Sequence, residues 1–455
     1  MRVPAFLSNK TLTYINNKYI INYRKMRLPA KIRNGGIQMK EIKRNLYLNK
    51  LIERKENDMI KVITGIRRCG KSYLLFTLYY NYLLSIGIDE SRIIKVDLDS
   101  EEHEDLLDAK KLGAYVREKI KDNDMYYVFL DEVQYVDGFE KVLNGLNRIP
   151  NLDIYVTGSN SKFLSTDILT EFRGRGDEVR IYPLSFSEFL DGFDGTKEEA
   201  WNEYVTYGGL PLILSRKSDE QKSKYLNDLF KKVYIDDIIE RNNLQKDEIL
   251  ETVINILASS IGSLTNPTKV ANTFESKGIK GVSNKTIGLY MNYLMEAFMI
   301  SKAERYDIKG RKYILTPSKY YFSDIGLRNA RLNFRQQEET HILENIIYNE
   351  LLVRGFNVDV GIVEHNVTED GKNIRKQLEV DFVCNQGSKR YYIQSAFAIP
   401  DEEKMNQEKS SLVRISDSFK KIIVVKDNIK LWRNEDGILI IGIQEFLLNP
   451  NSLDL

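Results

Sequence analysis

One segment near the start of the chain combines glycines, a lysine and a serine at a spacing that suits phosphate chemistry. Residues 61–75 read KVITGIRRCGKSYLL and match G-x-x-x-x-G-K-[ST], with Gly65, Gly70, Lys71 and Ser72 at the fixed positions. Glycines let successive backbone N–H groups turn toward a phosphate, a lysine reaches the terminal phosphates, and a serine hydroxyl binds Mg²⁺. The pattern therefore predicts a site for ATP and Mg²⁺, with nucleotide contacts from Gly65, Ile66, Arg67, Arg68, Cys69, Gly70, Lys71, Ser72 and Tyr73.

Two adjacent acids follow a second apolar run, which covers residues 125–130. Asp131 comes directly after this run, where its carboxylate would reach the Mg²⁺ shell. Glu132 is its neighbour, and a carboxylate there can orient and deprotonate an attacking water. Acids at the end of a strand are often only solvated. After an intact phosphate-binding pattern, we interpret Glu132 as the base of a hydrolytic reaction.

Two further groups of residues could act on the terminal phosphate. Ser159 and Asn160 end another predicted strand, where a hydroxyl or an amide could sense that phosphate; an ordinary turn is the alternative. Arg173 and Arg175 lie further on, and arginine suits the charge that develops on a transferring phosphate, in the same chain or from a neighbouring subunit. The residues alone do not choose between these two arginines, and a surface arginine pair is the alternative.

The elements that must position these residues form a repeating pattern of strands and helices. Besides the strand before the phosphate loop, the sequence has four further apolar runs that we predict as strands, and helical stretches lie between several of them. These runs are 92–100, 125–134, 151–161 and 178–185. Strands that are apolar along their whole length predict an α/β fold with a parallel sheet covered on both faces. Ligands of such sheets bind at the carboxyl ends of the strands, where the phosphate loop, the two acids and the predicted sensors are expected to lie.

Composition narrows the class of protein. The two cysteines, Cys69 and Cys384, lie far apart in sequence, which argues against a disulfide scaffold and suits a reducing cytoplasm. His103, His341 and His365 show no metal-ligand spacing, so a zinc site is not expected. No apolar run is long enough to span a bilayer, and we predict a cytoplasmic protein without a membrane partner.

Residues 1–38 have an unusual charge balance, with eight Lys or Arg and no Asp or Glu. The rest of the chain has 59 Lys and Arg against 65 Asp and Glu, a net charge of −6. Such a basic leader could be a targeting peptide or an arm that binds nucleic acid. Alternatively, residues 35–38 can be encoded as a ribosome-binding sequence, and translation would then begin at Met39.

From residue 39 to about 450, the chain resembles bacterial and archaeal ATPases of the AAA superfamily that carry a C-terminal endonuclease-like domain of unknown function. The resemblance implies a P-loop NTPase core of the additional-strand, catalytic-glutamate type at 39–195, with Glu132 as that glutamate and Arg175 in the family's Gly-Arg position. The segments that carry it are TGIRRCGKS (64–72), VFLDEVQ (128–134), YVTGSNSKFL (155–164), FRGRG (172–176), YPLSFSEFL (182–190) and YGGLP (207–211).

Two modules are predicted after this core. Residues 196–250 are charged and helix-rich, and we interpret them as a helical lid over the nucleotide. Residues 251–335 suggest a winged helix whose third helix, 283–297, buries Ile287, Tyr290, Met291 and Leu294, with strands at 312–317 and 319–324 as its wing. Its outward face is poor in Lys and Arg, so both DNA contact and a plain interaction role stay open.

The last part, 336–455, has the element order of an endonuclease-like core. Nucleases of this type gather two Mg²⁺-binding carboxylates and a lysine at one pair of strands. Asp381 matches the first acid, with Glu379 beside it, but the second acid falls on Gln394 and the lysine on Ala396. We therefore predict a degenerate fold without nuclease activity.

The functional hypothesis is a Mg²⁺-dependent ATPase whose nucleotide state switches the arrangement of its C-terminal domains. The alternative is a DNA-binding regulator that uses ATP as a structural ligand and turns it over negligibly. An oligomer is possible, since an arginine acting on a neighbouring subunit would require one.

Overall fold

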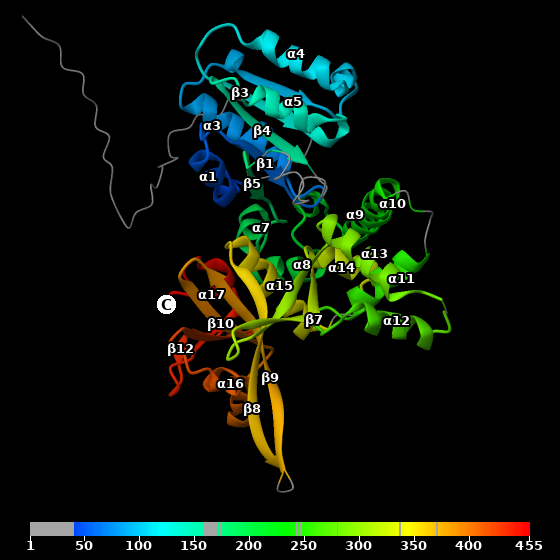
Figure 1. The fold of residues 1–455 in the computed structure, drawn as a ribbon. Helices are drawn as coiled ribbons and strands as arrows, with labels where there is room; N and C mark the ends of the chain where they lie inside the picture. The colour runs from blue at the N-terminus through cyan, green and yellow to red at the C-terminus, as the bar shows by residue number, and fades with distance from the viewer. Residues whose placement is uncertain are drawn as a thin grey trace, which may run out of the picture.

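The computed structural model describes residues 41–158, 172, 174–242, 244, 248–279, 281–335, 338–369 and 372–455 (Figure 1). The predicted leader at 1–38 and the start at Met39 lie outside these residues. Two sheets dominate the molecule. One lies in the N-terminal part, and the other extends into a long ribbon at the opposite end (Figure 1).

The N-terminal sheet is parallel, as its apolar runs predict. Its strands are β1 Ile60–Thr64, β2 Ile93–Asp97, β3 Tyr126–Asp131, β4 Leu152–Gly158 and β5 Gly176–Arg180. They are ordered β2-β3-β4-β1-β5, and all of the pairings are parallel. Because β4 lies between β1 and β3, the strand that precedes the phosphate loop and the strand that ends in Asp131 are not neighbours.

Helices cover both faces of this sheet. Side chains of a strand alternate between its faces, so Val62 packs in one apolar cluster with Leu112 of α4 and Leu143 of α5, and Ile63 in another with Leu75. The first face carries α4 Ala109–Lys119 and α5 Phe139–Leu146. The second carries α1 Asn45–Glu53 and the continuous run α2 Lys71–Tyr73, η2 Leu74–Tyr79 and α3 Tyr80–Ser85. Short 3₁₀ turns lie at η3 Glu90–Arg92, η4 Glu101–Leu107 and η5 Val133–Tyr135.

Helices also make up most of the middle of the chain. They are α7 Phe186–Gly192, α8 Lys197–Tyr207, η7 Pro211–Ser215, α9 Asp219–Leu229, η8 Phe230–Ile235, α10 Asp236–Arg241, α11 Glu248–Ser259, α12 Pro267–Ser276, α13 Asn284–Glu296 and α14 Ile325–Arg331. In α13 the buried side chains are the four that the sequence predicts. Within the described ranges, no helix is both long enough and apolar enough to cross a lipid bilayer.

The C-terminal sheet begins earlier than the predicted boundary at residue 335. Its order is β12-β13-β11-β10-β9-β8-β6-β7, so β6 and β7 from the preceding module pair directly with β8 of the last one. The strands are β6 Ile300–Asp307, β7 Lys312–Phe322, β8 Asn357–Glu369, β9 Lys372–Gln386, β10 Lys389–Ala396, β11 Lys420–Val425, β12 Trp432–Arg433 and β13 Leu439–Gly442. One sheet thus joins the two modules.

The prediction of two strands at 312–317 and 319–324 is wrong, because β7 is continuous. The backbone does not turn at Ser318. Instead, its N–H and C=O pair with Thr265, and the strand goes on to pair with β6 at Lys319 and Tyr320.

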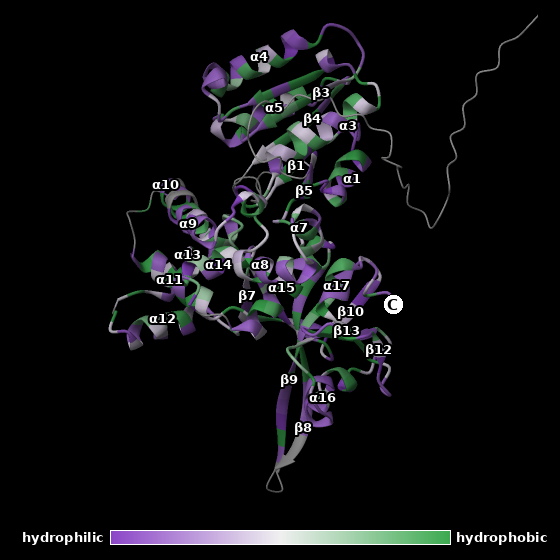
Figure 2. Ribbon diagram, turned by 180° about the vertical axis from the view of Figure 1, so that it is seen from behind, coloured by the Kyte–Doolittle hydropathy of each residue, from purple (hydrophilic) through white to green (hydrophobic). Residues whose placement is uncertain are grey.

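Helices pack on both faces of the C-terminal sheet as well. Side chains of α15 Glu339–Val353 and α17 Ile443–Leu448 share one apolar cluster with β8, β9 and β10, and α16 Glu402–Lys409 lies against the other face. η9 Leu412–Arg414 follows α16. Beyond the helices, β8 and β9 continue as a two-stranded ribbon, and Figure 2 shows that much of β9 in this ribbon is hydrophilic.

Candidate functional site

The phosphate-binding pattern lies between β1 and the helical run that begins at Lys71. Gly65 follows the last residue of β1, with φ +144°, and a Cβ on it would stand 2.2 Å from the carbonyl oxygen of Ile181. Gly70 has φ +101° and precedes the helix. Only glycine fits at position 65, where a Cβ would clash. The backbone conformation at position 70 strongly favours glycine, so both glycines shape the loop.

The lysine of the pattern points back into the loop. Its Nζ donates hydrogen bonds to the carbonyl oxygens of Gly65, at 3.0 Å, and Ile66, at 3.3 Å, and the side chain is buried. Ile66 and Cys69 have buried side chains, whereas Arg68, Ser72 and Tyr73 are exposed. The ammonium group of Lys71 is thus held at the centre of a loop whose outer positions are accessible.

Asp131 ends β3 and meets the serine of the loop. Its carboxylate accepts hydrogen bonds from the hydroxyl groups of Ser72 and Thr157. Burial raises the pKa of Asp131, the two hydroxyl groups act in the opposite direction, and Glu132 raises it further. A hydroxyl and a carboxylate are hard oxygen ligands, and Mg²⁺ needs only one or two of them when phosphates and water complete its shell. The pair therefore fits Mg²⁺.

Glu132 adopts a backbone conformation that is rare for residues other than glycine. Its φ of +49° and ψ of +47° lie in the left-handed region. Its backbone N–H donates to the hydroxyl oxygen of Thr157 at 3.0 Å, and its carboxylate accepts from the side-chain amide of Gln134. This conformation turns the chain directly after β3, and such strained positions concentrate at functional sites.

Thr157 begins the segment of the predicted sensors, and in the structure its hydroxyl group contacts both Asp131 and Glu132. It lies on β4, between β1 and β3, and its side chain is fully buried. The predicted sensors Ser159 and Asn160 follow the end of β4 at Gly158 and lie outside the described residues, as does Arg173.

Arg175 is exposed and lies directly before β5, at the end of the sheet opposite the phosphate loop. Its carbonyl oxygen accepts a hydrogen bond of 2.8 Å from the N–H of Ile60, the first residue of β1. The phosphate loop begins after Thr64, the last residue of β1. Four strand residues span roughly 13 Å, so the structure does not bring Arg175 to the loop of its own chain.

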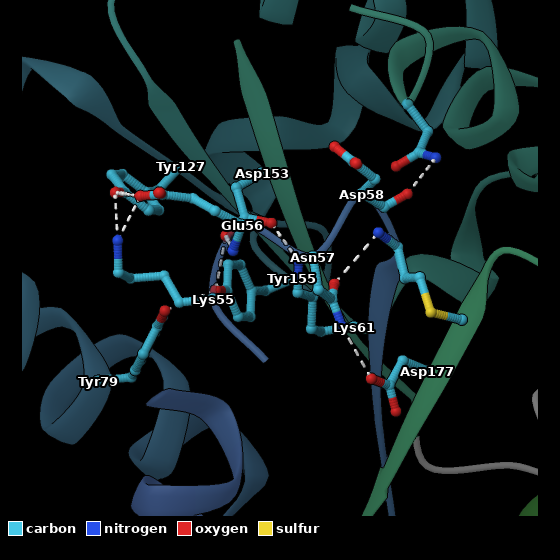
Figure 3. A network of polar contacts seen from close by, with 12 residues as sticks. Lys55, Glu56, Asn57, Asp58, Lys61, Tyr79, Tyr127, Asp153, Tyr155 and Asp177 are labelled. Atoms are coloured by element: carbon cyan, nitrogen blue, oxygen red, sulfur yellow. Dashed lines mark hydrogen bonds and ion pairs between the residues drawn. The ribbon is translucent and has the colours of Figure 1, made fainter. Parts of the chain in front are cut away.

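A network of polar contacts anchors this end of the sheet (Figure 3). Lys61 is fully buried on β1 and forms an ion pair with Asp153 of β4. Asp153 also accepts from the hydroxyl of Tyr155 at 2.7 Å, and that hydroxyl lies 2.5 Å from the hydroxyl of Tyr79 in η2. Because the ion pair is buried, breaking it would leave an uncompensated charge in the core. The network ties the helix that follows the loop to β1 and β4.

The helices predicted as a lid contact the loop directly. The hydroxyl of Tyr234 donates to the carbonyl oxygen of Arg67 at 2.8 Å, and the Arg67 side chain forms an ion pair with Asp237 at 3.1 Å. A cavity of about 460 Å³ adjoins the loop here. It is lined by Arg68, Leu212, Arg216, Gln221, Lys224, Tyr225, Asp228 and Leu229.

Comparison with known proteins agrees with this geometry. A family model described as an AAA domain matches residues 57–190, which include the whole N-terminal sheet and its loop. The chain belongs to the AAA superfamily of P-loop ATPases. A second model, described as a domain of unknown function, matches residues 198–338 of this AAA protein, across the helices from α8 and as far as β7 and α14.

Full-length relatives of this AAA protein occur in bacteria and archaea. An uncharacterized protein of Haemophilus influenzae is 36% identical over 416 residues, covering 90% of this chain and 98% of that protein. An uncharacterized protein of Methanocaldococcus jannaschii is 28% identical over 433 residues, covering 92% of this chain and 88% of that protein. The similarity to both proteins therefore extends over most of the chain.

Some solved structures are more distantly similar to this AAA protein. The Aeropyrum pernix ORC1 protein in complex with DNA is 12% identical, covers 64% of this chain and 92% of its own, and has a TM-score of 0.29. AMPPCP-bound DnaA from Aquifex aeolicus is 16% identical, covers 55% of this chain and 86% of its own, and has a TM-score of 0.29.

Proposed function

We propose that this AAA protein hydrolyses ATP with the help of Mg²⁺ at the loop between β1 and α2. The observation that carries the proposal is the hydrogen-bonded set formed by Ser72, Asp131, Thr157 and Glu132, which joins the loop to the ends of β3 and β4. A loop that only binds phosphate does not need a strained acid beside its metal-binding acid. Hydrolysis requires such an acid to activate water.

In the proposed mechanism, the chain supplies binding, orientation and a base. Lys71 would exchange its contacts with the loop carbonyls for the terminal phosphates, and Ser72 and Asp131 would hold the metal ion. When bound, Mg²⁺ neutralises the charge that develops on the transferring phosphate. Glu132 orients the attacking water and takes its proton. Thr157 fixes the positions of both acids through its hydroxyl group.

The cavity beside the loop is a suitable place for the rest of the nucleotide. It adjoins Arg68 of the loop on one side and helix α9 on the other. Its lining combines positively charged side chains with leucine side chains. The hydroxyl of Tyr225 in this lining is buried without a hydrogen-bond partner. A buried polar group is normally satisfied, so a ligand with a hydrogen-bonding edge would complete the cavity.

The nucleotide state would reach the C-terminal domains through α14. Asp324 caps this helix, and its carboxylate also accepts from the N–H of Gly209 at 2.7 Å, in the turn that leads to Pro211 beside Gly70. At the same turn, the side-chain amide of Asn329 donates to the carbonyl oxygens of Val205 and Thr206. A movement of the lid would therefore move α14 and, with it, the end of β7.

Any role for Arg175 would be fulfilled on a neighbouring subunit. Its exposure at the far end of the sheet, with its backbone held by β1, supports a contact of this kind rather than one within its own chain. The proposal thus includes assembly of two or more copies in the active state.

The test compares phosphate release by the wild-type protein and by Glu132→Gln. We expect ATP turnover to fall by at least about a hundredfold in the variant, because general-base catalysis contributes that much, while ATP binding is retained. Glu140→Gln, on the helix after the second acid, is the matched control and should leave turnover unchanged. A Glu132→Gln protein with normal turnover would remove the assignment.

A second candidate is the DNA-binding regulator with ATP as a structural ligand. It is supported by the order of α11, α12, α13 and the β6–β7 hairpin, which is the order expected of a winged helix, and by the bridge between Thr265 and Ser318. Lys309, Arg311 and Lys312 are exposed on the hairpin, whereas Lys302 pairs with Glu304. Salt-dependent DNA binding that weakens when these three cations are replaced, together with negligible ATP turnover, would favour this candidate.

A further inference from the structure

A lysine lies among three carboxylates in the C-terminal domain. The Nζ of Lys319, on β7, is 2.8 Å from Glu344 of α15, 2.7 Å from Glu379 and 3.5 Å from Asp381, both of β9. Lys319, Glu344 and Asp381 are buried, and Glu379 is partly exposed. The three elements that meet here, β7, α15 and β9, are separate in sequence, and no sequence pattern places Lys319 in this group.

The cluster is well supplied with hydrogen bonds. Glu344 also accepts from the hydroxyl of Tyr321 at 2.6 Å, and Asp381 accepts from the backbone N–H of Ser395 at 2.8 Å. Burial alone would lower the pKa of Lys319, but the three carboxylates raise it above its ordinary value, so the group is charged. A buried ion cluster with this many partners holds its geometry firmly.

The cluster includes Asp381, which matches the first acid of the endonuclease pattern, and Glu379 beside it. Gln394, at the position of the second acid, has a neutral amide, and its side-chain oxygen accepts a hydrogen bond from the N–H of Asp381 at 3.4 Å. With Lys319 in place, the described residues contain no group of three or more His, Cys, Asp or Glu side chains arranged to hold a metal ion, and this cluster is no exception. The ammonium group of Lys319 is the cation that these carboxylates share.

We propose that Lys319 is a built-in cation that takes the place of a divalent metal ion among Glu344, Glu379 and Asp381. An ammonium group offers three fixed donors to three acceptors, as Lys319 does here. It cannot polarise a phosphodiester or lower the pKa of a bound water as a metal ion does. The C-terminal core is thereby metal-independent, and the cluster serves as an ionic joint that fixes β7 to α15 and β9.

This proposal does not depend on ATP, so its test uses the full chain without nucleotide. Binding of Mn²⁺ is measured by electron paramagnetic resonance in the wild type, Asp381→Asn, Lys319→Met and the double variant Lys319→Met/Asp381→Asn. We expect wild type and Asp381→Asn to bind equal amounts of Mn²⁺. Lys319→Met should gain a site that stabilises it against heat, because ligands stabilise the state that binds them, and the double variant should lose that site.

Each other outcome also decides the question. If Lys319→Met fails to fold, the double variant should fold, since it removes one of the uncompensated negative charges; restored folding then supports the proposal. A wild-type Mn²⁺ site that disappears in Asp381→Asn would overturn it. So would a folded Lys319→Met that gains no Mn²⁺ site, or an unfolded one that the second change does not restore.

Discussion

The hydroxyl oxygen of Thr157 accepts a hydrogen bond of 3.0 Å from the backbone N–H of Glu132. The same hydroxyl donates its proton to the carboxylate of Asp131. One buried side chain on β4 therefore holds two successive residues at the end of β3. Since a hydroxyl has a single proton to donate, both of these directions are defined.

The first prediction concerns this bridge. Thr157→Val keeps the shape of the side chain but leaves a buried carboxylate and a backbone N–H with one hydrogen-bond partner fewer. This loss should lower the free energy of unfolding by about 1–3 kcal/mol. We expect ATP turnover to fall by about 10- to 100-fold, because small displacements of positioning groups have effects of this size. Thr157→Ser retains the hydroxyl and should keep most of the activity. Equal turnover in wild type and Thr157→Val would show that the bridge does not position the acids.

The second prediction uses the left-handed backbone of Glu132. Both Glu132→Gly and Glu132→Ala remove the carboxylate and should abolish turnover. Glycine adopts this conformation without strain, whereas a residue with a Cβ is less stable there by about 1–2 kcal/mol. We therefore expect the glycine variant to melt at a higher temperature than the alanine variant. The reverse order would mean that this backbone turn is absent in solution.

The third prediction concerns pH and the cap of α14. Burial raises the pKa of Asp324 to about 6, although three backbone N–H groups act to lower it. The folded state then binds a proton more tightly than the unfolded state, so the contribution of Asp324 to stability is present below pH 4 and lost as the pH rises toward 6. The loss amounts to about 3 kcal/mol.

The measurement is the melting temperature of wild type and Asp324→Asn at several pH values. An amide does not titrate, so the difference between the two proteins should shift in favour of the variant between about pH 4 and pH 6. The substitution also changes the melting temperature by an amount that does not depend on pH, so the test uses only how the difference between the two proteins varies with pH. A difference that does not vary with pH would contradict the raised pKa.

The N-terminal sheet could be predicted because its signals are local. Most of its strands are rich in apolar residues, and the polar residues that follow β1, β3 and β4 must meet at one edge once the strands are parallel. The exception is β5, Gly176–Arg180, which is mostly polar and overlaps the predicted run 178–185 only at its last three residues. Gly65 and Gly70 have the positive φ values that their spacing implies. The same logic accounts for the four buried side chains of α13, which recur with the period of a helix.

What could not be predicted depends on contacts between distant segments. Lys319 reaches Glu344 and Asp381 only after β7, α15 and β9 have packed together, and nothing in the KYYFSD segment marks this lysine. The position of Arg175 follows from the register of β5 against β1, which the sequence does not encode locally. The contacts of Thr157 to Asp131 and Glu132 likewise form only when β4 lies beside β3.

Binding of ATP itself tests the account most directly. Isothermal titration with a non-hydrolysable ATP analogue and Mg²⁺ should show saturable one-to-one binding to the wild-type protein. Lys71→Ala removes the ammonium group from the centre of the loop and should weaken this binding by at least about tenfold, the loss of a charge-assisted contact of 1.5 kcal/mol or more. No detectable binding to the wild type with Mg²⁺ present, or equal binding by both proteins, would contradict the account.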